Sequence, residues 1–355
     1  MKSQKRTYHI IGGGIAGLAC AWLLRQKKKN AHIALYEAKD YVGGRAVATK
    51  NDADRILKII SKKDLFLSLF AKSEDWKRHL CFFDMKTKKL ENKVRRNMDV
   101  FYKIFGGETE SHLAEVIQKQ IKHLICSRGI LHHDLWLANQ EIGMRICNVM
   151  ASAADDVFYE WRLRELIAED NKIVKLRFNT KIITLGKKDK IILALDNLTC
   201  HKFLDVPKLP HYAVANIVYQ TSETVFLPQG VSFVGLKNSA ADCIVSENRC
   251  VTAVVTDCPS NKKEREALAQ KIWLEIDQVR RVNSAFLPEY KIVYEKNASV
   301  KQDAETNDLR PKNAKTQYCN VFIAGDWTMK NEPCRMETAV KSAERAVKAA
   351  TRLVF

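Results

Sequence analysis

Tyr8-His9-Ile10-Ile11-Gly12-Gly13-Gly14-Ile15-Ala16-Gly17-Leu18-Ala19-Cys20 joins an apolar run to a glycine-rich turn and then to a helical run. The apolar run predicts a buried parallel strand. Each of three glycines has a separate expected task. Gly12 makes the tight turn, Gly14 lets the backbone approach a pyrophosphate, and Gly17 lets the helix pack close to the strand.

The helix and a second strand extend this pattern. The helix begins at Ile15 and Ala16, so its first N–H groups would point at bound phosphates. His32-Ile33-Ala34-Leu35-Tyr36 predicts the second strand, and Glu37 follows it, where a carboxylate can accept both ribose hydroxyls. Three glycines alone are not specific, but strand, helix, second strand and terminal acid together predict a site for an adenine dinucleotide.

A second glycine pair follows this acid almost at once, in Ala38-Lys39-Asp40-Tyr41-Val42-Gly43-Gly44-Arg45. Gly43 and Gly44 allow another close backbone approach, and Arg45 adds a fixed positive charge. This suits a pyrophosphate held from two sides and an arginine near an electron-rich ring.

A third block lies near the other end of the chain. The run from Asn320 to Trp327 predicts a buried strand that ends in Gly325-Asp326, at the edge where ligands bind in parallel sheets. Met336 and Glu337 then open an alanine-rich helix, whose N-terminus can face a bound anion.

Together the three blocks resemble the flavin-dependent amine oxidase and carotenoid desaturase superfamily, which implies FAD as the cofactor. By this resemblance, the first block would hold the ADP half with Glu37 and Ala38, and Gly43, Gly44 and Arg45 would line the pyrophosphate and flavin. Gly325 and Asp326 would bind the ribityl or pyrophosphate region, Met336 and Glu337 would lie beneath the flavin ring, and the backbone near Ile182 would touch adenine. Only one dinucleotide fingerprint is present, so a second domain for NAD(P)H is not expected.

A narrower resemblance covers residues 7–49 and 130–350, with gaps. Tyr294-Glu295-Lys296-Asn297-Ala298-Ser299-Val300, Leu309-Arg310-Pro311 and Ala324-Gly325-Asp326-Trp327-Thr328 resemble the hydroxysqualene dehydroxylases, also called squalene-associated FAD-dependent desaturases. The resemblance implies a lipophilic isoprenoid substrate. Reduced FAD would deliver hydride to hydroxysqualene as its allylic hydroxyl leaves, and the product would be squalene, in hopanoid or triterpene synthesis.

Some positions depart from that family and keep two alternatives open. Asn51–Lys58 replaces an Asp-x-Gly-x-His-like segment, Asp196 replaces a common proline, and Met329–Glu332 differs from a Thr-Gly-Leu-like run. One alternative is an FAD-dependent amine oxidase or carotenoid-type desaturase with another substrate, although Trp327 is the only aromatic residue of the last motif, which argues against an amine. The other is a decayed FAD-binding protein without catalysis.

The length of 355 residues is enough for two domains. We expect an α/β fold: a discontinuous Rossmann-like FAD-binding domain with an inserted α+β substrate domain. The FAD-binding domain would comprise residues 1–50, 170–205 and 315–355, and the substrate or cap domain residues 51–169 and 206–314. No signal peptide and no apolar run of membrane-spanning length is apparent, which favours a cytoplasmic protein.

The formal net charge of +18 is the strongest compositional bias. The lysines are spread over many turns and accompany no nucleic-acid motif, so we do not expect a nucleic-acid partner. Two explanations stay open: a solvated basic surface, or peripheral attachment to the anionic inner face of the cell membrane. A triterpene substrate would favour the second. The sequence does not predict the oligomeric state.

The remaining elements follow from periodicity. The expected helices are 52–72, 109–127, 136–168 and 262–282, the first of which could be core or part of a lipophilic lid. A hairpin is expected at 80–84 and 86–90, strands at 174–178, 181–185 and 191–195, and an antiparallel substrate sheet at 212–220, 232–236, 243–246 and 249–257.

No metal site is expected. The ten cysteines form no Cys-x-x-Cys pair, which favours reduced, packed thiols, and Cys334 alone falls near the expected flavin. His132-His133-Asp134 lacks a third ligand at a suitable spacing. No catalytic residue is assigned, and Asn139, Asn216 and Tyr219 are open candidates for pocket polar groups.

Overall fold

The computed structural model describes residues 6–46, 59–61, 76–77, 80–91, 135–138, 140–231, 233–247, 249–284 and 286–352. The chain divides into two compact units. The first comprises Met1–Val47, Gln140–Leu209 and Glu305–Phe355, and the second Ala48–Asn139 and Pro210–Ala304. Residues 140–169, 206–209 and 305–314, which we expected in the substrate domain, lie in the first unit.

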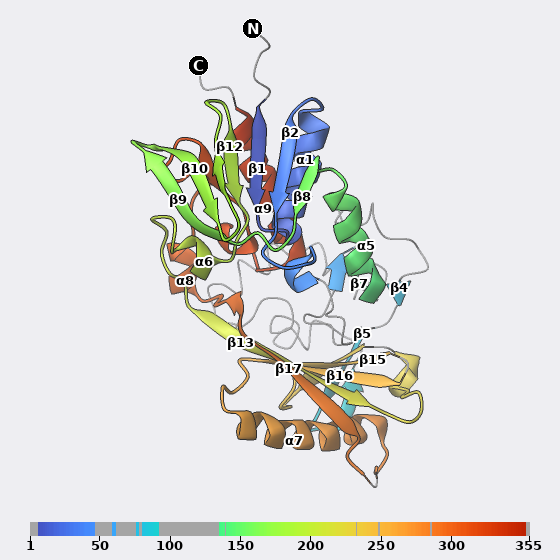
Figure 1. Ribbon diagram of the computed structural model, residues 1–355. Helices are drawn as coiled ribbons and strands as arrows, with labels where there is room; N and C mark the ends of the chain where they lie inside the picture. Colours follow the sequence, from blue (N-terminus) through green and yellow to red (C-terminus); the bar gives the residue numbers. More distant parts are fainter. Residues whose placement is uncertain are drawn as a thin grey trace, which may run out of the picture. The chain divides into compact units, whose positions relative to one another are not determined.

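A five-stranded sheet forms the centre of the first unit (Figure 1). Its strands are β1 (Thr7–Ile11), β2 (His32–Tyr36), β8 (Asp156–Phe158), β12 (Lys190–Leu193) and β18 (Val321–Ile323). Their order is β18-β12-β1-β2-β8, and every neighbouring pair is parallel. The predicted Rossmann-like α/β fold is confirmed, including the expected strands at 8–11, 32–36 and 191–195.

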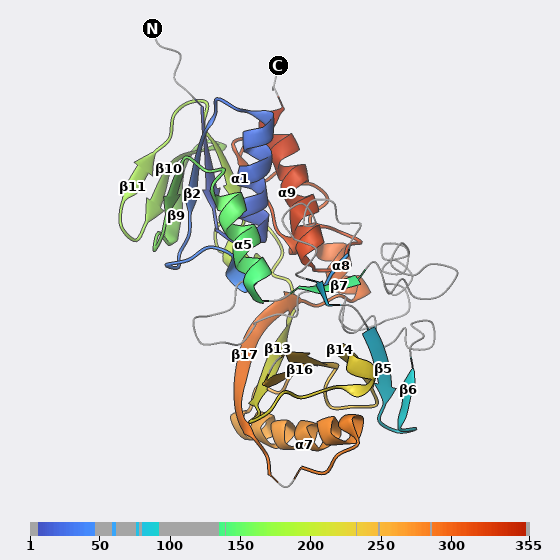
Figure 2. The same ribbon diagram turned by 90° about the vertical axis from the view of Figure 1, so that its right-hand side faces the viewer.

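Both faces of this sheet are covered. Helices α1 (Ile15–Lys27), α5 (Gln140–Ala151) and α9 (Met336–Thr351) lie on one side, and strands β9 (Leu163–Glu169), β10 (Lys172–Phe178) and β11 (Ile182–Thr184) on the other (Figure 2). Because α1 packs against the sheet, α5 and α9, most of its side chains are buried, including Leu18, Ala21 and Leu24. A helix buried on several sides needs no single apolar stripe.

The predicted helix at 136–168 is wrong over most of its length. Leu135–Ala138 forms strand β7, and α5 ends at Ala151. The following residues enter strands β8 and β9, because β-branched and aromatic residues such as Val157 and Phe158 suit the edge position beside β2.

The other two predicted helices of this region fall mainly on undescribed positions. Ile59–Ser61, within the predicted helix 52–72, forms strand β3 and pairs with β7, as does β4 (Trp76–Lys77). The rest of that segment and the predicted helix 109–127 lie outside the described residues.

The second unit contains a seven-stranded sheet covered by one helix. The strands are β5 (Leu80–Asp84), β6 (Lys89–Glu91), β13 (His211–Gln220), β14 (Phe233–Lys237), β15 (Cys243–Glu247), β16 (Cys250–Thr256) and β17 (Glu289–Val300). Their order is β17-β13-β16-β15-β14-β5-β6, antiparallel throughout except for β14 and β5. The predicted hairpin and antiparallel sheet are confirmed.

Helix α7 (Lys262–Arg280) packs on this sheet through Ala269, Ile272, Trp273, Ile276 and Val279. Their spacing of three and four residues places them on one face of the helix. Short elements complete the fold: η1 (Gly44–Ala46), α6 (Asn197–Cys200), η5 (Pro228–Gly230), α8 (Ala304–Leu309) and η6 (Asp326–Thr328). Among the described residues, no helix is long and apolar enough to cross a membrane.

A buried amide joins the two sheets of the first unit. Asn320, just before β18, accepts a hydrogen bond from Ile173 N at 2.9 Å and donates one to Ile173 O at 2.8 Å. Asn320 is only 1% exposed, so water cannot replace either bond.

We therefore predict that Asn320→Ala lowers the free energy of unfolding by about 2 kcal/mol or more, because two buried hydrogen bonds are lost together. Chemical denaturation of the purified protein measures this. Gln317→Ala, at an exposed position, is the control. Equal stability of the two variants would contradict the prediction.

Candidate dinucleotide-binding site

Three backbone segments meet at the first glycine turn with no room for side chains. Gly12 has a φ of +106°, and a Cβ there would lie 2.4 Å from Ala194 O, at the end of β12. A Cβ on Gly17 would lie 1.9 Å from Gly12 O. Glycine at both positions therefore allows β1, α1 and β12 to approach one another, as the sequence predicted for the turn and for the helix–strand contact.

Gly14 differs from its neighbours because a Cβ there would meet nothing within 4 Å. Gly14 is also the N-cap of α1, and this helix start has neither a side-chain cap nor an acidic residue in its first turn. An uncapped helix N-terminus beside open space, with Ile15 and Ala16 in the first turn, is a suitable place for an anion.

Glu37 is fixed beside this turn by backbone N–H groups. Its carboxylate accepts hydrogen bonds from Gly13 N at 2.7 Å and from Lys39 N at 2.9 Å, and Ala38 lies within the small loop so formed. Each carboxylate oxygen keeps further acceptor capacity. A Cβ on Gly13 would lie 2.9 Å from Glu37 Oε2, so Gly13 is also needed here. We did not predict this role, although the run of three glycines was its signal.

The second glycine pair lies directly on the first turn. Gly43 N donates to Gly13 O at 2.7 Å, and Gly43 and Gly14 form a parallel bridge. Gly43 and Gly44 have φ angles of +111° and +56°, and a Cβ on Gly44 would lie 3.3 Å from Gly14 Cα. The two glycine blocks predicted to act together are thus in contact.

The C-terminal block joins the same site through an ion pair. Arg45 and Asp326 lie 3.0 Å apart, and Asp326 also accepts a hydrogen bond from Trp327 N at 2.9 Å. Gly325 has a φ of +151°, and its N–H donates to Ser342 Oγ of α9 at 2.8 Å. Arg45 therefore connects the N-terminal glycine blocks to the strand-end acid.

The start of helix α9 is held by two arginines. Arg335 is the N-cap and forms a 3.0 Å ion pair with Glu337, while Met336 is the first helical residue. Arg310 is 3% exposed and donates to Met329 O at 3.2 Å, Glu332 O at 2.8 Å and Cys334 Sγ at 3.3 Å. Arg310, which the sequence placed in a motif without a role, therefore fixes the loop before α9.

Ile182 does not join the other predicted residues in any described contact. It lies on edge strand β11, paired with Arg177, and its side chain is 52% exposed. The described segment that contacts the backbone of Glu37 is the end of β8. Phe158 O accepts from Glu37 N, and Trp161 N donates to Glu37 O, both at 2.8 Å. Because we had predicted a helix over 136–168, this contact was not foreseen.

Two of the open candidates for pocket polar groups are buried in the second unit. Tyr219, an open pocket candidate, donates its hydroxyl to Ala269 O at 2.6 Å inside the core of the second unit, and Asn216 is buried on the same strand. Among the described cysteines, burial raises the pKa of Cys258 to about 11 and that of Cys81 to about 12. His132-His133-Asp134 and Asn139 lie outside the described residues, and within the described part of the chain no cluster of His, Cys, Asp or Glu suits a metal ion.

Together, the parallel sheet, the uncapped glycine turn and Glu37 at the end of β2 define a dinucleotide-binding protein of the Rossmann type. The sequence matches the family model of NAD(P)-binding Rossmann-like domains over residues 10–62 and that of flavin-containing amine oxidoreductases over residues 73–351. The chain belongs to the flavin-containing amine oxidoreductase family and is an FAD-dependent oxidoreductase.

Two curated relatives are called hydroxysqualene dehydroxylase. The protein from Zymomonas mobilis is 29% identical over 194 residues, which are 54% of this chain and 46% of the relative. The protein from Rhodopseudomonas palustris is 29% identical over 208 residues, 56% of this chain and 47% of the relative. The match thus spans about half the length of these relatives.

Solved structures support the fold. A putative protoporphyrinogen oxidase from Exiguobacterium has a TM-score of 0.64 and 14% identity, with 98% of each chain covered. Putrescine oxidase has a TM-score of 0.65 and 14% identity, covering 97% of this chain and 98% of the other.

The residues present fit the FAD that this family binds. The open space at Gly14 and the uncapped start of α1 suit a pyrophosphate, and the remaining acceptor sites of Glu37 suit ribose hydroxyls.

Substitutions at Gly14 and Gly17 test FAD binding and folding separately. Gly14→Ala places a methyl group in the open space, so we expect unchanged stability and FAD affinity reduced at least about tenfold. Gly17→Ala overlaps Gly12 O, and we expect a loss of about 3 kcal/mol or more. Thermal unfolding of the apoprotein and FAD titration measure the two effects. Wild-type FAD affinity in a folded Gly14→Ala variant would contradict the role of the open space.

Arg310 provides a second test. A lysine side chain has one nitrogen and cannot occupy both the Nη1 position, which donates to two carbonyls, and the Nη2 position, which donates to Cys334 Sγ. Arg310→Lys should therefore loosen the loop before α9 and weaken FAD binding at least about tenfold. The measurement is the dissociation constant for FAD, with Lys312→Gln, at an exposed position, as the control. Unchanged FAD affinity would show that the loop does not influence the site.

Proposed function

We propose that this protein reductively removes the hydroxyl group of a lipophilic isoprenoid, and that its substrate is hydroxysqualene and its product squalene. The choice of substrate rests on the match to curated relatives called hydroxysqualene dehydroxylase. The run Leu309-Arg310-Pro311, which resembles the Arg-Pro motif of hydroxysqualene dehydroxylases, adds support, and Arg310 fixes the loop before α9.

The proposal assigns each part of FAD to described residues. Gly12, Gly14, Ile15, Ala16 and Gly17 would hold the pyrophosphate through the turn and the start of α1. Glu37 would accept the ribose hydroxyls, with Ala38 adjoining it. The end of β8, with Trp161, is a better candidate for the adenine side than Ile182, because Trp161 N contacts Glu37 O.

The remaining blocks would hold the flavin half. Gly43 and Gly44 would close over the pyrophosphate, and Gly325 and Asp326 would bind the ribityl chain, with Asp326 oriented by Arg45. Met336 and Glu337 begin α9, whose N-terminal end would help hold negative charge on the reduced cofactor.

When bound and reduced, FAD supplies the hydride that replaces the departing hydroxyl. The hydroxyl leaves as water, so one proton is required in addition to the hydride. The chain's own contribution is to orient the cofactor through the contacts above. Asp196, where the family commonly has proline, caps helix α6 by accepting from Thr199 N at 2.9 Å, so this departure has a structural explanation.

A triterpene substrate resides in the lipid bilayer. We therefore extend the proposal to a protein of the cytoplasm that attaches peripherally to the inner, anionic face of the cell membrane. The net charge of +18 supports such an attachment.

Anaerobic reduction of the FAD-loaded protein followed by hydroxysqualene tests the reaction. We expect the visible bands of oxidised flavin to return, with one squalene formed for each flavin reoxidised. Squalene added in place of hydroxysqualene is the control. A flavin that stays reduced with hydroxysqualene, but is bleached in its oxidised form by an amine or a carotenoid precursor, would contradict the proposal.

A further inference from the structure

The N-terminal part of the first unit carries positive charge that is separate from the dinucleotide site. Residues 1–36 contain seven basic residues and no Asp or Glu: Lys2, Lys5, Arg6, Arg25, Lys27, Lys28 and Lys29. Arg6 precedes β1, and the three consecutive lysines stand at and after the end of α1. Helix α1 has 13 residues, so its two ends lie about 20 Å apart and the lysines are far from the turn at Gly14.

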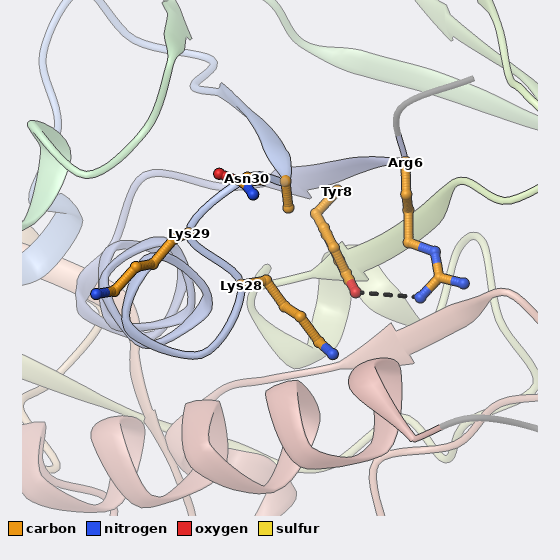
Figure 3. A pocket seen from close by; sticks show the side chains of 6 residues that line it. Arg6, Tyr8, Lys28, Lys29 and Asn30 are labelled. Atoms are coloured by element: carbon orange, nitrogen blue, oxygen red, sulfur yellow. Dashed lines mark hydrogen bonds between the residues drawn. The ribbon is translucent and has the colours of Figure 1, made fainter. Parts of the chain in front are cut away.

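Part of this charge surrounds an open pocket (Figure 3). The pocket has a volume of about 340 Å³ and is lined by Arg6, Tyr8, Lys28, Lys29, Asn30 and Ala31. Arg6 donates to the Tyr8 hydroxyl at 3.4 Å. Figure 3 shows Arg6 and Lys28 extending on either side of that hydroxyl, whereas Lys29 turns away. Three cationic side chains and no carboxylate line the pocket.

The charge is not balanced by nearby acids in the described part of the chain. The Nε of Arg6 is buried and has no hydrogen-bond partner there. Asp189 accepts from Thr7 N at 2.9 Å and faces His9 at 3.5 Å, and Asp155 pairs with Arg25 at 2.6 Å. These carboxylates are therefore already engaged.

Lys190, on strand β12 beside β1, lies in the same excess of positive charge. Burial lowers the pKa of Lys190, Cys319 raises it in part, and the positive charges of Arg6 and Lys172 lower it. A bound anion would relieve this repulsion.

We propose that Arg6 and Lys28, with the basic residues around them, bind the phosphate head groups of an anionic membrane. The spread of charge favours a lipid surface over a single soluble ion. Arg6 and Lys28 extend on either side of the Tyr8 hydroxyl while Lys29 points in another direction (Figure 3), and this spread suits a plane of head groups. This inference locates the membrane attachment proposed above and rests on it, but it is independent of the reaction at the flavin.

The test is co-sedimentation of the FAD-loaded protein with vesicles of phosphatidylcholine, with and without phosphatidylglycerol. We expect binding only to the anionic vesicles, weakening as salt is added. The double variant Arg6→Gln, Lys28→Gln should bind them about tenfold to thirtyfold more weakly. The control double variant Lys262→Gln, Lys263→Gln on α7 removes the same charge from an exposed helix start and should bind like the wild type.

The bound flavin's visible spectrum and the thermal midpoint show whether each variant is folded, so loss of lipid binding can be distinguished from loss of the FAD site. Equal weakening in both double variants would overturn the proposal, because it would show a dependence on net charge alone. Release by micromolar pyrophosphate at constant ionic strength would overturn it in favour of a soluble phosphate. Equally tight binding to duplex DNA through the same two residues would overturn it in favour of a nucleic acid.

Discussion

The fold depends on the close approach of three backbone segments at Gly12. The carbonyl of Gly12 lies where a Cβ of Gly17 would be, and the carbonyl of Ala194 lies where a Cβ of Gly12 would be. Strand β1, helix α1 and strand β12 can therefore come together only without side chains at these points. The same contact leaves the N-terminus of α1 uncapped beside open space at Gly14, so the packing that closes the fold also prepares the anion site.

Two further contacts bring segments from distant parts of the sequence into the same site. Gly43 hydrogen bonds to Gly13, and Arg45 pairs with Asp326, which is far away in the sequence. The first contact adds the second glycine pair to the turn, and the second joins the C-terminal segment to it. The unit has to be discontinuous in sequence for these residues to meet. Arg310 then fixes the loop that leads from this junction into α9.

The sequence predicted the parts of the fold whose signals are local. The β1–α1–β2 pattern, the hairpin at β5 and β6, and helices α7 and α9 all follow from apolar periodicity and glycine positions. Strand β8 was missed because its three residues closely follow a helix, and only its pairing with β2 makes it a strand. Gly13 and Arg310 were visible in motifs, but their roles depend on where a carboxylate and two carbonyls lie in space. The neighbour of Glu37 is likewise set by long-range pairing, in this case by the end of β8.

The central claim is that the first unit binds FAD through both its halves, the adenosine side at Glu37 and the flavin side at Arg45 and Asp326. Equilibrium titration of the apoprotein with FAD, FMN and NAD tests it most directly. FMN lacks the adenosine that Glu37 would hold, and NAD lacks the flavin. The account predicts that FAD binds at least about a hundredfold more tightly than either. Equal affinity for FMN and FAD would contradict it, because Glu37 and the α1 turn would then have no part in binding.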